Sequence, residues 1–343
     1  MIYIGTYIAL LFGSLFELIL NKRAIKTSFF LLMLLFFVAI FRVGTGTDFS
    51  AYLNLWENVD LFNPDKADSY QYVEIGFRLF ISTLKLLTEN DFIYFVFLAA
   101  IPLFFFYRAI LYFKLYPTTA LIFYFTFFYF AYLFNAIGQA ITISIMLYSI
   151  KFIIDRNLRY VLFLCLLSTL IHFSGIVILI LYIIMNFKIS SIQSYLSSII
   201  VGLIFFKFQI NNIILEFIFP GKFSVYYTFF DKGSSAFQTI TKIGIFSLLF
   251  FFSFKIKNDL YQKSFRAYSF GIFLFLSLLE QNMLGTRFFM LFKPLEILMI
   301  LLILSHCKNI FTRIIIFLVF LIPYSIQFYT NINNPDFLYN LRF

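Results

Sequence analysis

Charged side chains are scarce in this sequence. Asp, Glu, Lys and Arg make up 12% of its 343 residues, whereas 62% are hydrophobic and phenylalanine alone occurs 55 times. Soluble domains carry about 25% charged residues and cannot bury so much apolar surface. The composition therefore excludes a soluble protein and predicts an all-α integral membrane protein. No stretch is polar enough for a separate soluble domain, so we expect residues 1–343 to form a single polytopic transmembrane domain.

Cysteine and histidine are also rare, with two of each. Cys165 and Cys307 lie far apart in apolar runs, which excludes a disulfide framework and a thiolate metal site. Two histidines, His172 and His306, argue against a zinc site, and no acidic pair has metal-binding spacing. The segment GTGTD (44–48) lacks the preceding strand and the following lysine of a nucleotide-binding loop. We therefore expect no metal and no cofactor.

Apolar windows of helical length follow one another along the chain. They predict about twelve transmembrane helices, at 2–20, 28–41, 91–113, 117–134, 135–154, 158–173, 174–187, 194–208, 239–255, 266–282, 288–305 and 313–330. The run at 2–20 has no basic segment before it and no small-residue cleavage site after it, so we interpret it as a retained helix. Longer polar loops are expected at about 42–90 and 209–238.

Basic residues occupy every second short loop, which fixes the expected orientation. The basic loops follow the first, third, fifth, seventh, ninth and eleventh apolar runs, and Asp155 and Asp259 are the acids within them. The net charge of +10 therefore indicates membrane topology rather than nucleic-acid binding. Both termini and the loop at 42–90 should lie outside. This holds only if 70–88 does not cross, and its apolar face opposite Glu74, Arg78 and Lys85 predicts an amphipathic helix at the outer surface.

The unusual polar residues then fall on this outer side, where six segments converge. They are Arg42, Asp48, Glu74, Asn135, Gln139, His172, Ser174, Glu280 and Arg287. Polar groups at membrane depth are costly and tend to line cavities or substrate paths.

Each of these residues also has a structural interpretation that the sequence leaves open. The structural alternatives are a snorkelling Arg42, an N-cap at Asp48, a solvated Glu74, helix-helix bonds from Asn135 and Gln139, a helix-end His172, and an Arg287–Glu280 pair. Lys293 and Glu296 lie three residues apart in an apolar run, which indicates an intramembrane ion pair or the floor of a cavity.

Five stretches carry a family resemblance. They are VGTGTDFSAYLNLW (43–56), EIGFRLFISTL (74–84), FNAIGQAITISIMLYSIKFI (134–153), LCLLSTLIHFSGIVILILY (164–182) and GTRFFMLFKPLEILMILLIL (285–304). In order, spacing and aromatic content, the chain resembles the EpsG/Wzy group of bacterial polysaccharide polymerases. It departs from the group at Ile75, where proline is usual, and at Gly138, where arginine is usual.

The resemblance implies a GT-C-like membrane glycosyltransferase of the bacterial inner membrane. Such an enzyme polymerises undecaprenyl-diphosphate-linked oligosaccharide repeat units, as in O-antigen synthesis, with its active site facing the periplasm. The expected partners are this lipid-linked oligosaccharide, membrane lipid, a chain-length regulator and a flippase.

The chemistry of this reaction assigns roles to the outer polar residues. A diphosphate leaves as an anion and needs cations, for which Arg42, Arg287 and Lys293 are the candidates. A sugar hydroxyl needs a base, and Asp48 and His172 compete for this role ahead of Glu74. Asn135, Gln139, Tyr52 and Ser174 are the expected sugar-binding residues.

Other functions stay open at this point. A lipid-linked oligosaccharide transporter or flippase is one, although no internal repeat is visible and the polar residues do not gather at the midplane. A membrane O-acyltransferase and a glycan ligase are others. Among these activities, formation of a ladder of products from one lipid-linked repeat is specific to a polymerase.

Overall fold

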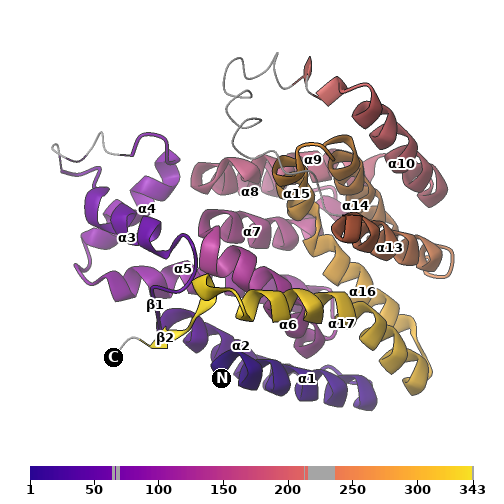
Figure 1. Ribbon diagram of the computed structural model, residues 1–343, viewed down its shortest axis with the longest axis horizontal. Helices are drawn as coiled ribbons and strands as arrows, with labels where there is room; N and C mark the ends of the chain where they lie inside the picture. Colours follow the sequence, from indigo (N-terminus) through magenta and orange to yellow (C-terminus); the bar gives the residue numbers. More distant parts are fainter. Residues whose placement is uncertain (64–65, 67–69, 212, 215–235, 342–343) are drawn as a thin grey trace. The chain divides into compact units, whose positions relative to one another are not determined.

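The protein is mainly helical in the part that the computed structural model describes, residues 1–63, 66, 70–211, 213–214 and 236–341 (Figure 1). Fifteen α-helices and one two-stranded sheet make up these residues, which confirms the all-α prediction. The predicted outer loop at 209–238 lies largely outside the described residues. The chain divides into two compact units, residues 1–180 with 307–343 and residues 181–306, and each is described by itself. The expectation of a single domain stays a prediction.

Unit 1 packs two groups of helices. The first group comprises α1 (Ile2–Leu20), α2 (Ile25–Ile40), α6 (Pro117–Phe123) and α17 (Ile310–Ile332), and the second α5 (Asp91–Tyr112), α7 (Ile137–Ile154) and α8 (Leu158–Ile171). A π-helix, η1 (Tyr124–Asn135), continues α6 and is almost entirely buried. Its rings interlock in edge-to-face and tilted pairs with each other and with Tyr3, Phe328 and Phe337. Aromatic packing therefore builds the core of this unit.

Unit 2 comprises the end of α9 (Val177–Asn186) with α10 (Ser191–Lys207), α13 (Ala236–Ser253), α14 (Asp259–Ser277), α15 (Asn282–Phe292) and α16 (Pro294–His306). A capping box of Ser190 and Gln193 begins α10. Pro294 lacks a backbone N–H, and the chain bends by 44° between α15 and α16. Beside the bend, Lys293 Nζ lies 3.3 Å from the carboxylate of Glu296. The two residues thus form the ion pair that was one of the two alternatives from the sequence, and its place within the membrane stays a prediction.

The prediction of about twelve transmembrane helices is wrong. Among the described residues, five helices are long and apolar enough to cross a membrane: α1, α5, the continuous 117–135, α7 and α17; the bent α15–α16 pair would be a sixth. A span needs about 20 residues at 1.5 Å each. The remaining apolar helices have 10–17 residues, and α14 carries Asp259, Lys263 and Arg266. Helices thus form close to the predicted windows, but several are too short or too polar for a clear span.

The predicted outer loop at 42–90 contains two helices, α3 (Phe49–Asn58) and α4 (Ile75–Lys85). α3 packs on α5 through the stacked rings of Phe49 and Phe95, whose centroids are 4.8 Å apart, and α4 packs on α8 (Figure 1). α4 is the expected amphipathic helix. Its Phe77 face is buried in the protein, whereas Leu79 is exposed. Placement of α4 at the outer membrane surface stays a prediction.

The C-terminal segment is tied to the start of this loop. Strand β2 (Asn340–Leu341) pairs antiparallel with β1 (Arg42–Val43), and the two strands lie together in Figure 1. Thr45 Oγ1 donates to the carbonyl of Leu338 at 3.0 Å, and the N–H of Gly46 donates to the carbonyl of Asp336 at 2.7 Å. These contacts hold residues 42–46 in place directly after the end of α2.

Candidate functional site

A cavity of about 370 Å³ opens in unit 1 where four chain segments meet. Its polar lining comes from α3, from residues 70–74 before α4, and from the end of α8. These residues are Asp48, Tyr52, Asn54, Tyr70, Tyr72, Glu74 and His172. Its volume lies in the range of small-molecule sites, and the combination of carboxylates with aromatic rings suits a sugar. The three candidate bases, Asp48, Glu74 and His172, therefore lie around one space.

Asp48 stands at the N-cap of α3, where its side chain makes no capping bond. Its carboxylate instead accepts a hydrogen bond from Thr47 Oγ1 at 3.0 Å, and the side chain is half-buried. The backbone N–H of Thr47 donates to Asn135 Oδ1 at 2.9 Å. Asn135 thus fixes the loop that carries Asp48, and it does so from the end of η1 rather than from the cavity wall.

The backbone conformation and close packing at position 46 require a glycine. Its φ of +100° is open to few other residues, and a Cβ there would lie 2.4 Å from the carbonyl oxygen of Phe134. The loop therefore packs directly on the backbone at the end of η1. This contact fixes Asp48 relative to α7, which begins two residues after Asn135.

Glu74 is the N-cap residue of α4 and connects that helix to the histidine segment. Its carboxylate accepts a hydrogen bond from the N–H of Phe173 at 2.8 Å. Gly76 lies so close to α8 that a Cβ would meet the carbonyl oxygen of Leu170 at 2.6 Å. Glu74 thus lines the cavity and also holds the backbone beside His172.

His172 ends α8, and its Nδ1 is held by Ser174. The N–H of Ser174 donates to Nδ1 at 3.1 Å, and Ser174 Oγ lies 2.8 Å from the same nitrogen. A backbone N–H can only donate, so Nδ1 accepts and the neutral imidazole carries its proton on Nε2. Ser174 Oγ bonds in turn with Thr142 Oγ1 at 3.0 Å. His172 is therefore held as a donor through Nε2, while its basic nitrogen is engaged.

Gly138 provides the room for this imidazole. A Cβ at Gly138 would lie 3.3 Å from His172 Cδ2, closer than most such contacts. The N–H of Gly138 also donates to the hydroxyl of Tyr52 at 3.2 Å. Tyr52 therefore presents its ring to the cavity with its oxygen tied to the start of α7. Burial raises the pKa of Tyr52 to about 12, so it is a neutral phenol at physiological pH.

Arg42 lies behind this site rather than in the lining. Its side chain is 4% exposed, its guanidinium carbon is 3.9 Å from the centre of the Phe134 ring, and Nη2 donates to the carbonyl of Leu133 at 3.0 Å. Nε and Nη1 have no hydrogen-bond partner among the described residues. Burial lowers the pKa of Arg42 to about 10, so it stays charged at neutral pH.

Comparison with known protein families shows to which family the chain belongs. The EpsG family matches residues 25–342. The chain belongs to the EpsG family. The match covers all elements of the cavity and nearly all of both units. No curated protein and no solved structure matches the chain.

Several predicted site residues of this EpsG-family chain do not line the cavity. Gln139 is half-buried on α7, and Asn135 and Ser174 support the lining residues from outside it. Arg287 and Lys293 belong to unit 2, where Arg287 is exposed on α15 and Lys293 is bonded to Glu296. The suggested partner of Arg287, Glu280, accepts a hydrogen bond from Gln209 Nε2 at 3.4 Å.

Other residues were missed from the sequence. Asn54 and Tyr70 line the cavity, and Tyr70 is held at a positive φ of 56°. The motif SYQYVE (69–74) carried a signal, because Tyr70 and Tyr72 lie four and two residues before the carboxylate of Glu74. In unit 2, Lys242 Nζ lies 3.6 Å from the centre of the Phe275 ring and 3.2 Å from Thr286 Oγ1. The sequence signal for Lys242 was its isolated position in an apolar run, since charged residues in such runs are rare.

Proposed function

We propose that the protein is a membrane glycosyltransferase that polymerises undecaprenyl-diphosphate-linked oligosaccharide repeat units on the periplasmic face of the inner membrane. Membership of the EpsG family supports this proposal. The observation that carries it is the cavity of unit 1, which combines Asp48, Glu74 and His172 with three tyrosines. A hydroxyl-bearing ring can stack on tyrosine while its hydroxyls bond to carboxylates.

In this proposal the acceptor sugar occupies the cavity and Asp48 is the base. The acceptor hydroxyl oxygen attacks the anomeric carbon of the donor glycan, and its proton passes to Asp48. The bond from that carbon to the diphosphate breaks, and the undecaprenyl diphosphate leaves as an anion. Asp48 is favoured because its carboxylate accepts a hydrogen bond from the hydroxyl of Thr47 on one oxygen, Oδ1, whereas Nδ1 of His172 is already engaged by Ser174. His172 acts instead as a hydrogen-bond donor to substrate oxygen.

The leaving diphosphate requires positive charge. Arg287 is the stronger candidate of unit 2, since its side chain is exposed and a guanidinium bonds phosphate oxygens in pairs. Lys293 is 7% exposed and already bonded to Glu296, so it suits a supporting role. Arg42, buried beside Phe134, contributes charge from behind the site rather than a direct contact.

The test is polymerisation by the purified full-length protein in liposomes with one lipid-linked repeat as the only substrate. A ladder of products supports a polymerase. Appearance of unmodified substrate in the opposite leaflet, without a ladder, would identify a flippase instead. Asp48→Asn should lower turnover by about 10²–10⁴-fold with substrate binding nearly intact. Glu57→Gln is the matched control, because Glu57 is an exposed carboxylate of the same helix outside the cavity.

The donor role of His172 gives a second readout. His172→Gln keeps an N–H donor, so we expect a smaller loss than with His172→Ala. Because the engaged Nδ1 is not the base, the pH profile of His172→Gln should keep the acidic limb of the wild-type profile. Loss of that limb in the variant would reassign the base to His172.

A further inference from the structure

Unit 2 contains a second cavity that the proposed glycosyl transfer does not use. It has a volume of about 300 Å³ and lies between α10 and α14, with the end of α9 at one side. The two helices run parallel, since Ser191 bonds Gln262 near their starts and Gly202 packs on Leu276 near their ends. Its walls are mainly apolar side chains, among them Ile183, Val201, Phe270 and Phe273.

Two polar atoms in this cavity have no partner among the described residues. They are Nε of Arg266 and Oγ of Ser194, and both are buried. Ser194 is 2% exposed. Buried donors in proteins are nearly always hydrogen-bonded, so two such atoms in one cavity indicate a ligand with acceptor oxygens.

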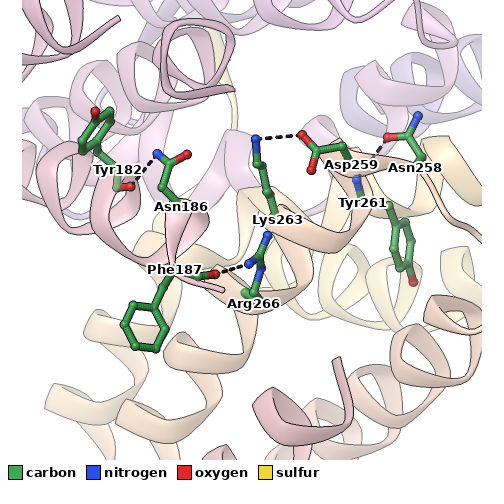
Figure 2. Close-up of polar contacts among 8 residues, drawn as sticks. All are labelled: Tyr182, Asn186, Phe187, Asn258, Asp259, Tyr261, Lys263 and Arg266. Carbon is green, nitrogen blue, oxygen red and sulfur yellow. Dashed lines mark hydrogen bonds and ion pairs between the residues drawn. The ribbon is translucent and has the colours of Figure 1, made fainter. Parts of the chain in front are cut away.

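Arg266 also has no ion-pair partner within 4.0 Å among the described residues, and Asp259 interacts with its charge only at longer range. Figure 2 shows Arg266 reaching the carbonyl oxygen of Phe187, whereas Lys263 turns to Asp259 at 2.7 Å. No carboxylate of the described part lies within 4.0 Å of Arg266. The ligand that completes this site should therefore carry negative charge on oxygen, as a phosphodiester does.

The cavity extends from this charge into an apolar groove. Ser194 to Val201 on α10 and Arg266 to Phe273 on α14 each cover about 10 Å at 1.5 Å per residue. Val201 is 37% and Ile183 60% exposed, so the groove opens to the apolar surroundings of the helices. A headgroup at one end and a hydrocarbon chain along the rest match this division of polar and apolar lining.

We propose that this cavity binds one anionic phospholipid. Its phosphodiester oxygens accept hydrogen bonds from Arg266 Nε and Ser194 Oγ, and one acyl chain lies in the groove between α10 and α14. Lys188 and Lys255 flank the charged end in the sequence and favour an anionic over a zwitterionic headgroup. The positive-inside pattern places this end at the cytoplasmic leaflet, whereas the diphosphate of the proposed substrate is expected at the other.

The site is tested by native mass spectrometry of the full-length protein released from nanodiscs that contain phosphatidylglycerol and phosphatidylcholine. The wild type should retain one phosphatidylglycerol. Arg266→Gln should lower this retention at least tenfold, since hydrogen bonds to charged groups have about this effect. Lys257→Gln is the control, because it removes the same charge from an exposed position outside the cavity and should leave retention unchanged.

Ser197→Phe tests the groove without touching the charge. It fills the apolar part of the cavity, so lipid should be lost although Arg266 stays. Ser194→Ala serves where Arg266→Gln fails to fold, and it should weaken retention in the same direction. Equal losses in Arg266→Gln and Lys257→Gln would overturn the proposal in favour of general surface charge. Displacement of the lipid by inorganic phosphate, together with unchanged retention in Ser197→Phe, would overturn the proposal in favour of a site for free phosphate. Displacement of the lipid by undecaprenyl phosphate would overturn it in favour of a site for the lipid carrier.

Discussion

The carboxylate of Glu74 accepts a hydrogen bond from the backbone N–H of Phe173, 2.8 Å away across 99 positions of sequence. Glu74 begins α4, and Phe173 directly follows His172 at the end of α8. The bond therefore fixes the spacing between two walls of the cavity. It gives Glu74 a positioning role that is separate from any contact with sugar.

Replacement of Glu74 separates these two roles. Glu74→Gln keeps an acceptor oxygen for Phe173, so we expect an unchanged melting temperature and modestly reduced turnover. Glu74→Ala loses the bond, and a half-buried interaction of this kind contributes about 1 kcal/mol. Its melting temperature and turnover should both fall. Equal turnover of the two variants, both far below wild type, would show that the charge itself contacts the reacting sugar.

Gly46 and Gly44 form a matched pair for testing the loop beside Asp48. Gly46→Ala places a Cβ 2.4 Å from the carbonyl oxygen of Phe134 at a φ of +100°, whereas a Cβ at Gly44 meets nothing within 4 Å at a φ of +63°. Gly44→Ala should cost about 1–2 kcal/mol from backbone strain alone. Gly46→Ala should cost clearly more and also lower turnover by moving Asp48. Thermal unfolding in detergent measures the loss of stability in each variant. Equal losses in Gly44→Ala and Gly46→Ala would exclude the packing contact between Gly46 and Phe134.

The sequence predicted much of the helical organisation, because long apolar runs form helices wherever lipid or protein surrounds them. The expected 2–20 and 91–113 correspond to α1 and α5 within one residue. The error was to count every apolar run as a transmembrane helix. The predicted windows 158–173 and 174–187 divide the apolar run at 158–187 where the helices break, beside His172, but both helices are too short for a clear span. The backbone at the break is held by the bond from the N–H of Ser174 to the His172 side chain. Window hydropathy does not contain that information.

The site was predictable in its residue types and less so in its geometry. Asp48, Glu74 and His172, which the sequence grouped by their expected outer placement, line one cavity, whereas that placement and their roles stay predictions. The position of Arg42 behind the wall depends on the ring of Phe134, 92 residues away in the chain. Such long-range aromatic packing has no local sequence signal, and the same holds for the pairing of β1 with β2.

Topology is the next expectation to test. In a background without Cys165 and Cys307, Asn63→Cys and Asn340→Cys should react with an impermeant thiol reagent in intact spheroplasts, because the basic loops indicate that both positions lie outside. Lys257→Cys, in a basic loop, should react only after the membrane is opened. Protection of Asn63→Cys and Asn340→Cys with labelling of Lys257→Cys would reverse the orientation and remove the periplasmic site.

Arg42 gives a prediction about charge. Burial lowers its pKa from 12.5 to about 10, a penalty of order 3 kcal/mol on the charged form. The folded pKa is below the unfolded one, so this cost is present at every pH below about 10 and disappears only as the pH rises beyond it. Arg42→Met removes the cost together with the contact to Phe134 and the bond to Leu133. We therefore expect it to stay folded, with a melting-temperature difference from wild type that is constant between pH 6 and 9.

Turnover should respond differently from stability. If Arg42 supplies charge to the proposed reaction from behind the wall, Arg42→Met lowers turnover at least tenfold, as removal of one electrostatic group in a dry site does. Arg42→Lys keeps the charge but loses the planar contact with Phe134, so it should retain more activity than Arg42→Met. Full turnover in Arg42→Met, measured in the liposome assay beside an exposed control such as Arg159→Gln, would limit Arg42 to packing against the end of η1.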